Sequence, residues 1–320
     1  MALHKIRVLC SDMSHLPLHF TMRDSGVPQK HGFDLEVDYV GTTGERPLRG
    51  LAERASCLLA GDYEFLSGLH HEPYAYRARG DKRFVYLAQT QNDWDDRLIA
   101  RQGITSAKEL EGKTVLTNGA PCVGGNLIAG LKQMGVDTAQ INFIMVKGSQ
   151  GEMNHINFEK VRRGEVDATT VDVPFDLRAR KLGMSVIELP SIPVIHNTTV
   201  CASMDFVSKN EEVVTAYLKA LIEAIHFFKT QGQRMCEILN RDLAPLIHLE
   251  GDDEVEYLHR EWSRLLSSKP YPHPVAVWNV YNLDVGHNPE LNFISPFEIW
   301  DTHYLRMIDD SGFIDSLYSS

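Results

Sequence analysis

Strand-like and helix-like segments alternate between residues 98 and 189, and this alternation restricts the fold more than any other feature of the sequence. Apolar, strand-like runs occur at 98–100, 114–117, 141–146, 166–171 and 186–189. Segments with helical spacing of apolar residues, each closed by a glycine, lie between them at 106–112, 127–135, 158–164 and 175–183. This alternation predicts a parallel sheet with helices on both faces. Ligands of such sheets bind beyond the carboxyl ends of the strands, so we expect one lobe of a ligand cleft here.

The remainder of the chain predicts a second α/β unit that ends in several helices. Its strands are predicted at 6–10, 33–40 and 84–89, and its helices at 17–24, 48–60, 210–231 and 255–265. The segment 267–296 holds five prolines and is predicted to be a loop, and 297–310 is predicted to be the last helix. Because no strands separate the late helices, we expect them to cover the first lobe.

Composition and charge exclude several classes of partner. The chain has 320 residues, of which 43% are apolar and 23% charged, which is typical of a soluble protein large enough for two domains. Its net charge is −11, from 32 basic and 43 acidic residues. A strongly acidic chain is a poor partner for nucleic acid or for an anionic membrane. A local cleft can still bind a small anion, because its charge can differ from that of the whole surface.

The amino terminus and the cysteines indicate where the protein works. His4, Lys5 and Arg7 interrupt the first apolar run, so residues 1–10 do not predict a secretory signal. No apolar run approaches the roughly 20 residues that cross a bilayer. Five cysteines, an odd number without metal-type spacing, fit a reducing compartment. Unless an export signal has been removed, we expect a cytoplasmic protein that does not insert into a membrane.

Four short motifs occur in a fixed order along the first 230 residues. They are Gly61-Asp62-Tyr63-Glu64-Phe65, Ile104-Thr105-Ser106 with Leu110-Glu111-Gly112-Lys113-Thr114-Val115, Arg163-Gly164-Glu165-Val166-Asp167-Ala168, and Phe206-Val207-Ser208-Lys209-Asn210-Glu211. In order and spacing they resemble the type II periplasmic-binding-protein superfamily. Within it, the chain is similar to the branch of nitrate-, sulfonate- and taurine-binding proteins and thiamine-pyrimidine synthases.

This resemblance implies an α/β, two-lobed fold with a central ligand cleft and extra C-terminal helices. It implies that residues 1–91 and 198–320 form lobe one and that residues 92–197 form lobe two, with hinge closure between them. The chain departs from the exported members in lacking a signal segment, and from the thiamine-pyrimidine synthases in lacking their cysteine-rich motif. The superfamily also includes intracellular aromatic-acid decarboxylases and an aryl-sulfinate desulfinase.

The glycine-rich segment 117–126 is the strongest ligand-binding candidate. A helix that starts after Pro121 would offer free backbone N–H groups to an anion. Four residues of this segment are predicted to bind ligand: Asn118, Gly119, Gly124 and Gly125. The alternative is an ordinary strand-to-helix turn. Cys122 is a candidate nucleophile, since a helix N-terminus lowers a thiol pKa, although a small buried core residue is the alternative.

Two groups of polar residues follow strands of the predicted first lobe. Asp12 and His15 come after the strand 6–10 and could act as a base and the group that orients it, or could simply close the turn. His70 and His71 form an unusual pair, of which one is expected to face the ligand, because neighbours on an extended segment point to opposite sides. A histidine there could transfer a proton near neutral pH. Their spacing does not support a metal site, and we expect neither a metal nor a cofactor.

Further ligand-binding residues are predicted around the crossings and loops. Arg46 could clamp a carboxylate or a sulfonate, or could be a solvated surface residue. Asp172 ends a predicted strand, but Asp-x-Pro is also ordinary turn chemistry. Asn197 and Thr198 lie where the chain crosses back, and they either bind ligand or satisfy the hinge backbone. Trp94 at the first crossing could stack on a ring-shaped ligand or belong to a surface turn.

Two functions of different classes are compatible with this sequence. The first is an intracellular enzyme that binds a small aromatic or heteroaromatic acid between the lobes and acts as a non-redox lyase of the decarboxylase or desulfinase type. The second is a solute-binding protein that delivers a small organic anion to the permease of an ABC importer. The missing signal, the odd cysteine number and the histidines at strand ends favour the enzyme, with His70, His71, Cys122, Asp12 and His15 as its candidate catalytic residues.

Overall fold

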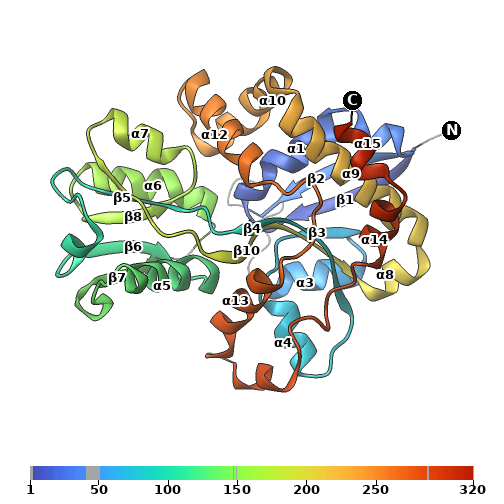
Figure 1. The fold of residues 1–320 in the computed structure, drawn as a ribbon, viewed down its shortest axis with the longest axis horizontal. Coiled ribbons are helices and arrows are strands. Elements are labelled where there is room, and N and C mark those ends of the chain that lie inside the picture. The colour runs from blue at the N-terminus through green and yellow to red at the C-terminus, as the bar shows by residue number, and fades with distance from the viewer. Residues whose placement is uncertain (1–2, 41–50, 147, 149, 287, 320) are drawn as a thin grey trace.

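The computed structural model describes residues 3–40, 51–146, 148, 150–286 and 288–319. It has the predicted α/β fold with two lobes, each built around a five-stranded sheet (Figure 1). The first sheet has the order β2-β1-β3-β10-β4 and the second has the order β7-β6-β8-β5-β9. The long strands β4 (Phe84–Asp93) and β10 (Pro193–Ser203) lead toward and away from the second lobe. The predicted lobe boundaries at 91/92 and 197/198 fall within these two strands, and the division of the chain there stays a prediction.

The sheet of lobe one begins with the parallel strands β1 (His4–Cys10), β2 (Phe33–Tyr39) and β3 (Phe65–Ser67). β10 is antiparallel to both β3 and β4. Because successive side chains point to opposite faces, Val8 and Leu9 are buried in two different apolar clusters. Both faces of this sheet are therefore covered.

Helices on the two faces of this sheet come from both ends of the chain. The Val8 cluster includes residues of α1 (Leu16–Asp24), α9 (Glu211–Thr230), α10 (Gly232–Ile238), α12 (Asp252–Leu265), α14 (His303–Asp310) and α15 (Phe313–Tyr318). The Leu9 cluster includes residues of α3 (Leu51–Ala60), α4 (Glu72–Ala78) and α13 (Pro274–Val285). Shorter helices are α2 (Val27–Lys30), α8 (Met204–Lys209) and α11 (Ala244–Ile247). The late helices thus pack on lobe one, as expected.

The sheet of lobe two is mixed, so the prediction of a parallel sheet is wrong for one of its strands. β6 (Thr114–Asn118) is parallel to β7 (Asn142–Val146) and to β8 (Ala168–Val171). β5 (Arg97–Ala100) runs antiparallel to β8 and to β9 (Ser185–Ile187). The chain enters this lobe through β5 from the crossing, so Arg97 pairs with Val171 at the edge where β8 ends. The crossing sets the direction of β5, and the alternation of strands and helices in the sequence does not predict this direction.

Three helices cover the second sheet: α5 (Asn126–Gln133), α6 (Gln150–Arg162) and α7 (Phe175–Lys181). Ile99 packs with Phe158 and Phe175 on one face, and Leu98 packs in the cluster of Leu127 on the other. The predicted capping box of Ser106 and Glu109 is present at a short 3₁₀ helix, Ala107–Leu110. α6 begins eight residues before the predicted start at 158. Its first turns carry buried polar residues in place of an apolar stripe.

The segment 267–296, predicted to be a loop, contains the helix α13 (Pro274–Val285). Pro274 stands in its first turn, where the missing N–H would have had no helical partner. Val277 and Val280 are fully or almost fully buried, so tertiary packing stabilises this helix. The last predicted helix starts at His303, six residues later than expected. None of the helices in the described residues combines the length and the apolar character that crossing a membrane requires.

Candidate functional site

The carboxyl ends of the strands in the two lobes face each other, and the loops that follow them are in contact. Asp12, after β1, accepts hydrogen bonds on Oδ1 from the backbone N–H of Ser14 at 2.9 Å and of Gly151 at 3.0 Å. Gly151 lies in the first turn of α6, in the other lobe. A Cβ atom at this glycine would lie 2.8 Å from Cβ of Met13, so a larger residue would push the lobes apart. The cleft is therefore closed at this point.

A small cavity lies between the lobes beside this contact. Its lining includes Met13, Asp95, Asp172, Asn197 and Trp262, which come from both lobes and from the crossings. Its volume is about 20 Å³, which is room for about one water molecule. A ring-sized ligand therefore does not fit into this cavity as it stands.

His15 and His70 form a neutral, buried pair at the strand ends of lobe one. Their rings stack with centroids 5.9 Å apart. Nδ1 of His15 lies 3.1 Å from Oγ of Ser67, and Nε2 of His70 donates to the carbonyl of Asn197 at 2.9 Å. Burial, with the neighbouring histidines, lowers the pKa of His70 to about 3 and the pKa of His15 well below its ordinary value. Both rings are therefore uncharged at neutral pH, which suits packing and hydrogen bonding.

His71 has the opposite character. Its Nδ1 lies 2.6 Å from Oδ2 of Asp284 on α13, and the Cys122 sulfur is a second neighbour of the ring. Burial opposes a charge on His71, but the sulfur and the carboxylate outweigh it and raise the pKa of His71 well above its ordinary value. Nε2 of His71 is buried, and none of the described residues meets the geometric criteria for a hydrogen bond to it. The charged ring is thus held between the Asp284 carboxylate and the Cys122 sulfur.

Sequence analysis did not find Asp284. It lies in α13, within the segment predicted to be a loop, and 213 positions separate it from His71. A carboxylate on a half-apolar helix carries no local signal of this pairing. The two predicted histidines, His70 and His71, do lie close together, and only His71 is charged.

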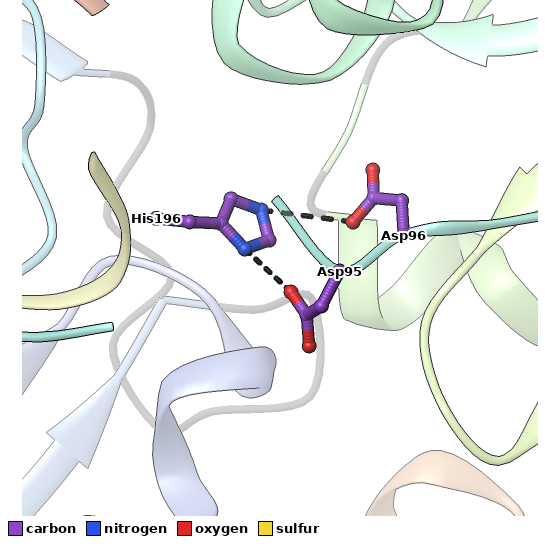
Figure 2. A group of neighbouring side chains, drawn as sticks. All are labelled: Asp95, Asp96 and His196. Atoms are coloured by element: carbon purple, nitrogen blue, oxygen red, sulfur yellow. Dashed lines mark ion pairs between the residues drawn. The ribbon is translucent and has the colours of Figure 1, made fainter. Parts of the chain in front are cut away.

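Asp95, Asp96 and His196 form a second buried cluster where the chain crosses between the lobes (Figure 2). Nδ1 of His196 lies 2.7 Å from Oδ1 of Asp95, and Nε2 lies 3.6 Å from Oδ1 of Asp96. Burial lowers the pKa of His196, but the two carboxylates outweigh this and raise it to about 10. Burial raises the pKa of Asp96 to about 6. The result is a protonated imidazole held between two acids.

These three residues could also be considered as metal ligands, since one ligand atom of each lies within 4.8 Å of the others. Imidazole and carboxylate groups are common ligands of divalent transition metals. Figure 2 shows, however, that each ring nitrogen faces a different aspartate, with the ring between them. A common metal centre needs the three atoms to converge on one point. The arrangement fits an ion triad that joins β10 to the β4–β5 crossing.

The glycine-rich segment is a compact turn that uses its own polar groups. The side chain of Asn118 accepts from the Ala120 N–H at 2.8 Å and donates to the Gly148 carbonyl at 2.9 Å. Residues Pro121–Gly125 form a π-helical turn, and the Gly124 N–H donates to Ala120. A Cβ at Gly124 would lie 2.6 Å from the Asn118 carbonyl oxygen. Close packing of the chain against itself is therefore one reason for a glycine at this position.

The other two glycines and Cys122 lie on the same turn. A Cβ at Gly125 would lie 3.2 Å from Leu283 of α13, whereas Gly119 has no neighbour closer than 3.8 Å. Cys122 is half-buried beside His71. The turn therefore contributes a thiol to the site and presses against the helix that carries Asp284.

The remaining predicted ligand residues lie after β8 and at the crossings between the lobes. Asp172 accepts on Oδ2 from the Asn154 side chain at 2.8 Å, and burial and the carboxylates of Asp96 and Asp12 raise its pKa. Asn197 has a left-handed backbone, with φ of 48°, and its amide donates to Gln91 at 2.9 Å. Thr198 is fully buried in β10, and its hydroxyl has no hydrogen-bond partner within the described ranges. Trp94 is buried at the crossing, where its backbone N–H donates to Ile192.

Arg46, the predicted anion clamp, lies outside the described residues. Another arginine of lobe one, Arg54, lies on α3. Its electrostatic neighbours include Asp12, His15 and Glu72. Burial lowers the pKa of its guanidinium, and Glu72 and Asp12 oppose this. In the sequence Arg54 looks like any charge on an amphipathic helix, so no local signal could have singled it out.

The fold and the facing strand ends define a two-lobed protein with an interlobe site, and comparisons with known proteins agree. Residues 97–234 match the family described as NMT1/THI5 like. No match to a curated protein sequence is significant. The structure is similar to the periplasmic sulfonate-binding protein SsuA from Methylobacillus flagellatus, with 16% identity and a TM-score of 0.67 over 98% of this chain and 96% of that one.

Two further solved structures have the same fold. The periplasmic aliphatic sulphonate-binding protein SsuA from Escherichia coli is 14% identical, with a TM-score of 0.65 over 90% of this chain and 93% of that one. The desulfurization enzyme DszB, solved with biphenyl-2-sulfinic acid, is 12% identical, with a TM-score of 0.66 over 96% of this chain and 99% of that one. The predicted resemblance to the type II periplasmic-binding-protein superfamily is thus confirmed for the fold. A transport protein and an enzyme match equally well, so the fold does not separate these functions.

Proposed function

We propose that this protein is an intracellular lyase that binds a small aromatic or heteroaromatic acid between its lobes and removes the acid group. The observation that carries the proposal is the 2.6 Å pair of His71 and Asp284, with Cys122 beside the same ring. A binding protein needs no charged proton donor of this kind, whereas a decarboxylase or desulfinase does. DszB, which shares the fold and was solved with an aryl sulfinic acid, supports the substrate class.

The chemistry that His71 would perform is protonation of the ring carbon. The bond from that carbon to the carboxylate or sulfinate breaks, the electron pair stays on the carbon, and CO₂ or SO₂ leaves. The proton on Nε2 of His71 passes to the carbon, and a proton from water restores the imidazolium. Asp284 orients the ring through Nδ1 and stabilises its charge, as a carboxylate does in other His–Asp pairs.

Turnover of a defined panel tests this proposal. The purified protein is incubated with benzoates, hydroxybenzoates and aryl sulfinates, and released CO₂ or sulfite is measured. The wild-type protein should turn over at least one compound, and His71→Gln should reduce kcat at least about 100-fold. His303→Gln is the matched control, because that exposed histidine is on α14 and pairs with Asp301, just before the same helix.

The competing function is solute binding for an importer, which the sulfonate-binding proteins of the same fold favour. It predicts stoichiometric binding of an organic anion without turnover in the same panel. Such binding, together with equal affinities of the wild-type protein and His71→Gln, would exclude the lyase.

A further inference from the structure

Arg54 is a cation whose guanidinium has no hydrogen-bond acceptor among the described residues. Its Nε is buried and has no partner among the described residues, and no acceptor in the described ranges receives a bond from its guanidinium. Arg54 also makes no ion pair within them, although Asp12 and Glu72 are its electrostatic neighbours. Oδ1 of Asp12 already accepts from two backbone N–H groups. The residue is partly exposed, but an unsatisfied buried donor such as its Nε is costly for the folded protein.

The position of Arg54 indicates what could accept its hydrogen bonds. α3 follows the β2 strand end, and the guanidinium shares electrostatic contacts with Asp12 after β1 and with Glu72 directly after His71. It thus lies at the carboxyl edge of the lobe-one sheet, where His71 and His15 also lie.

We propose that Arg54 binds an acid group of the ligand, and this inference rests on the proposed function of the cleft. A planar guanidinium matches a carboxylate or a sulfinate with two parallel N–H···O bonds. The ligand class is therefore an anion with two oxygens on one centre, and a neutral amide of the same shape does not bind. The same cation explains how a protein of net charge −11 attracts an acid.

The test compares Arg54→Met with the wild-type protein. Methionine keeps the length of the stem and removes the unpaired charge. Without ligand, Arg54→Met should unfold about 2 °C higher than the wild type, because the buried donor is gone. Its affinity for benzoate and for benzenesulfinate should fall about 10- to 100-fold by calorimetry. Benzamide should bind neither protein. Arg79→Met, which removes an exposed arginine paired with Glu290, is the control and should change neither quantity.

The outcomes separate this inference from the lyase. Arg54→Met with wild-type affinity for both anions overturns the inference, and so does a wild-type protein that binds neither anion. A lower unfolding temperature for Arg54→Met also overturns it, since Arg54 would then be a structural partner. If the wild type binds anions through Arg54 but turns over no acid, the inference stands and the lyase falls. If acids are turned over with the same KM in Arg54→Met, the lyase stands and the inference falls.

Discussion

Two arginines, Arg178 and Arg54, show how differently this molecule treats charge. Arg178 on α7 donates through Nε to Glu254 at 2.8 Å and through Nη2 to the His248 carbonyl at 2.7 Å, and it lies over the Phe175 ring. Arg54 at the cleft has no such partners among the described residues. The first cation is satisfied where it lies, whereas Nε of the second has no partner among the described residues. The proposal that Arg54 binds a ligand rests on this difference.

The two neighbouring histidines repeat this contrast. His70 is neutral and donates to a backbone carbonyl, whereas His71 is charged and lies between the Asp284 carboxylate and the Cys122 sulfur. Residues next to each other in the sequence therefore have opposite chemistry. The strand end directs one ring into the lobe-one interior and the other toward Asp284.

The largest expected effect is at the satisfied arginine. Arg178→Met leaves the Glu254 carboxylate buried without its cation, so the free energy of unfolding should fall by about 3–5 kcal/mol in a urea titration. The double variant Arg178→Met/Glu254→Met should recover most of this loss, since no buried charge is then left alone. A single-variant loss below about 1 kcal/mol would break the comparison with Arg54.

The next effect concerns the charged histidine. Asp284→Asn removes a carboxylate that raises the pKa of His71, so that pKa should fall, as an NMR titration of the ring protons would show. A raised histidine pKa stabilises the fold fully below the unfolded value of about 6.5, and the stabilisation is lost as pH rises through the folded value. Wild-type stability should therefore decline with rising alkaline pH more than that of Asp284→Asn. Unchanged titration of His71 would contradict the pairing.

The smallest effect is expected at the neutral histidine. In His70→Gln the glutamine amide can still donate to the Asn197 carbonyl. The free energy of unfolding should therefore change by less than about 1 kcal/mol. Turnover, if the protein is a lyase, should fall far less than in His71→Gln. Equal losses in both variants would show that the two rings act as one unit.

Local pattern in the sequence predicted most of the secondary structure. Strand periodicity, the Ser106–Glu109 capping box and the glycines that end helices depend only on residues a few positions apart. The family motifs added the two-lobed arrangement, and they placed the site at strand ends. The location of His70, His71 and Cys122 at one cleft follows from these features together.

Tertiary structure alone decided the chemistry within that cleft. The direction of β5 depends on where the crossing enters the second lobe, and α13 forms because its apolar residues are buried against lobe one. Asp284 pairs with His71 although 213 positions separate them in the sequence. Nε of Arg54 has no partner among the described residues because tertiary packing brings no acceptor to it from that part of the chain. The charge and the hydrogen-bond partners of a side chain depend on groups that packing brings near, so no short-range pattern could report them.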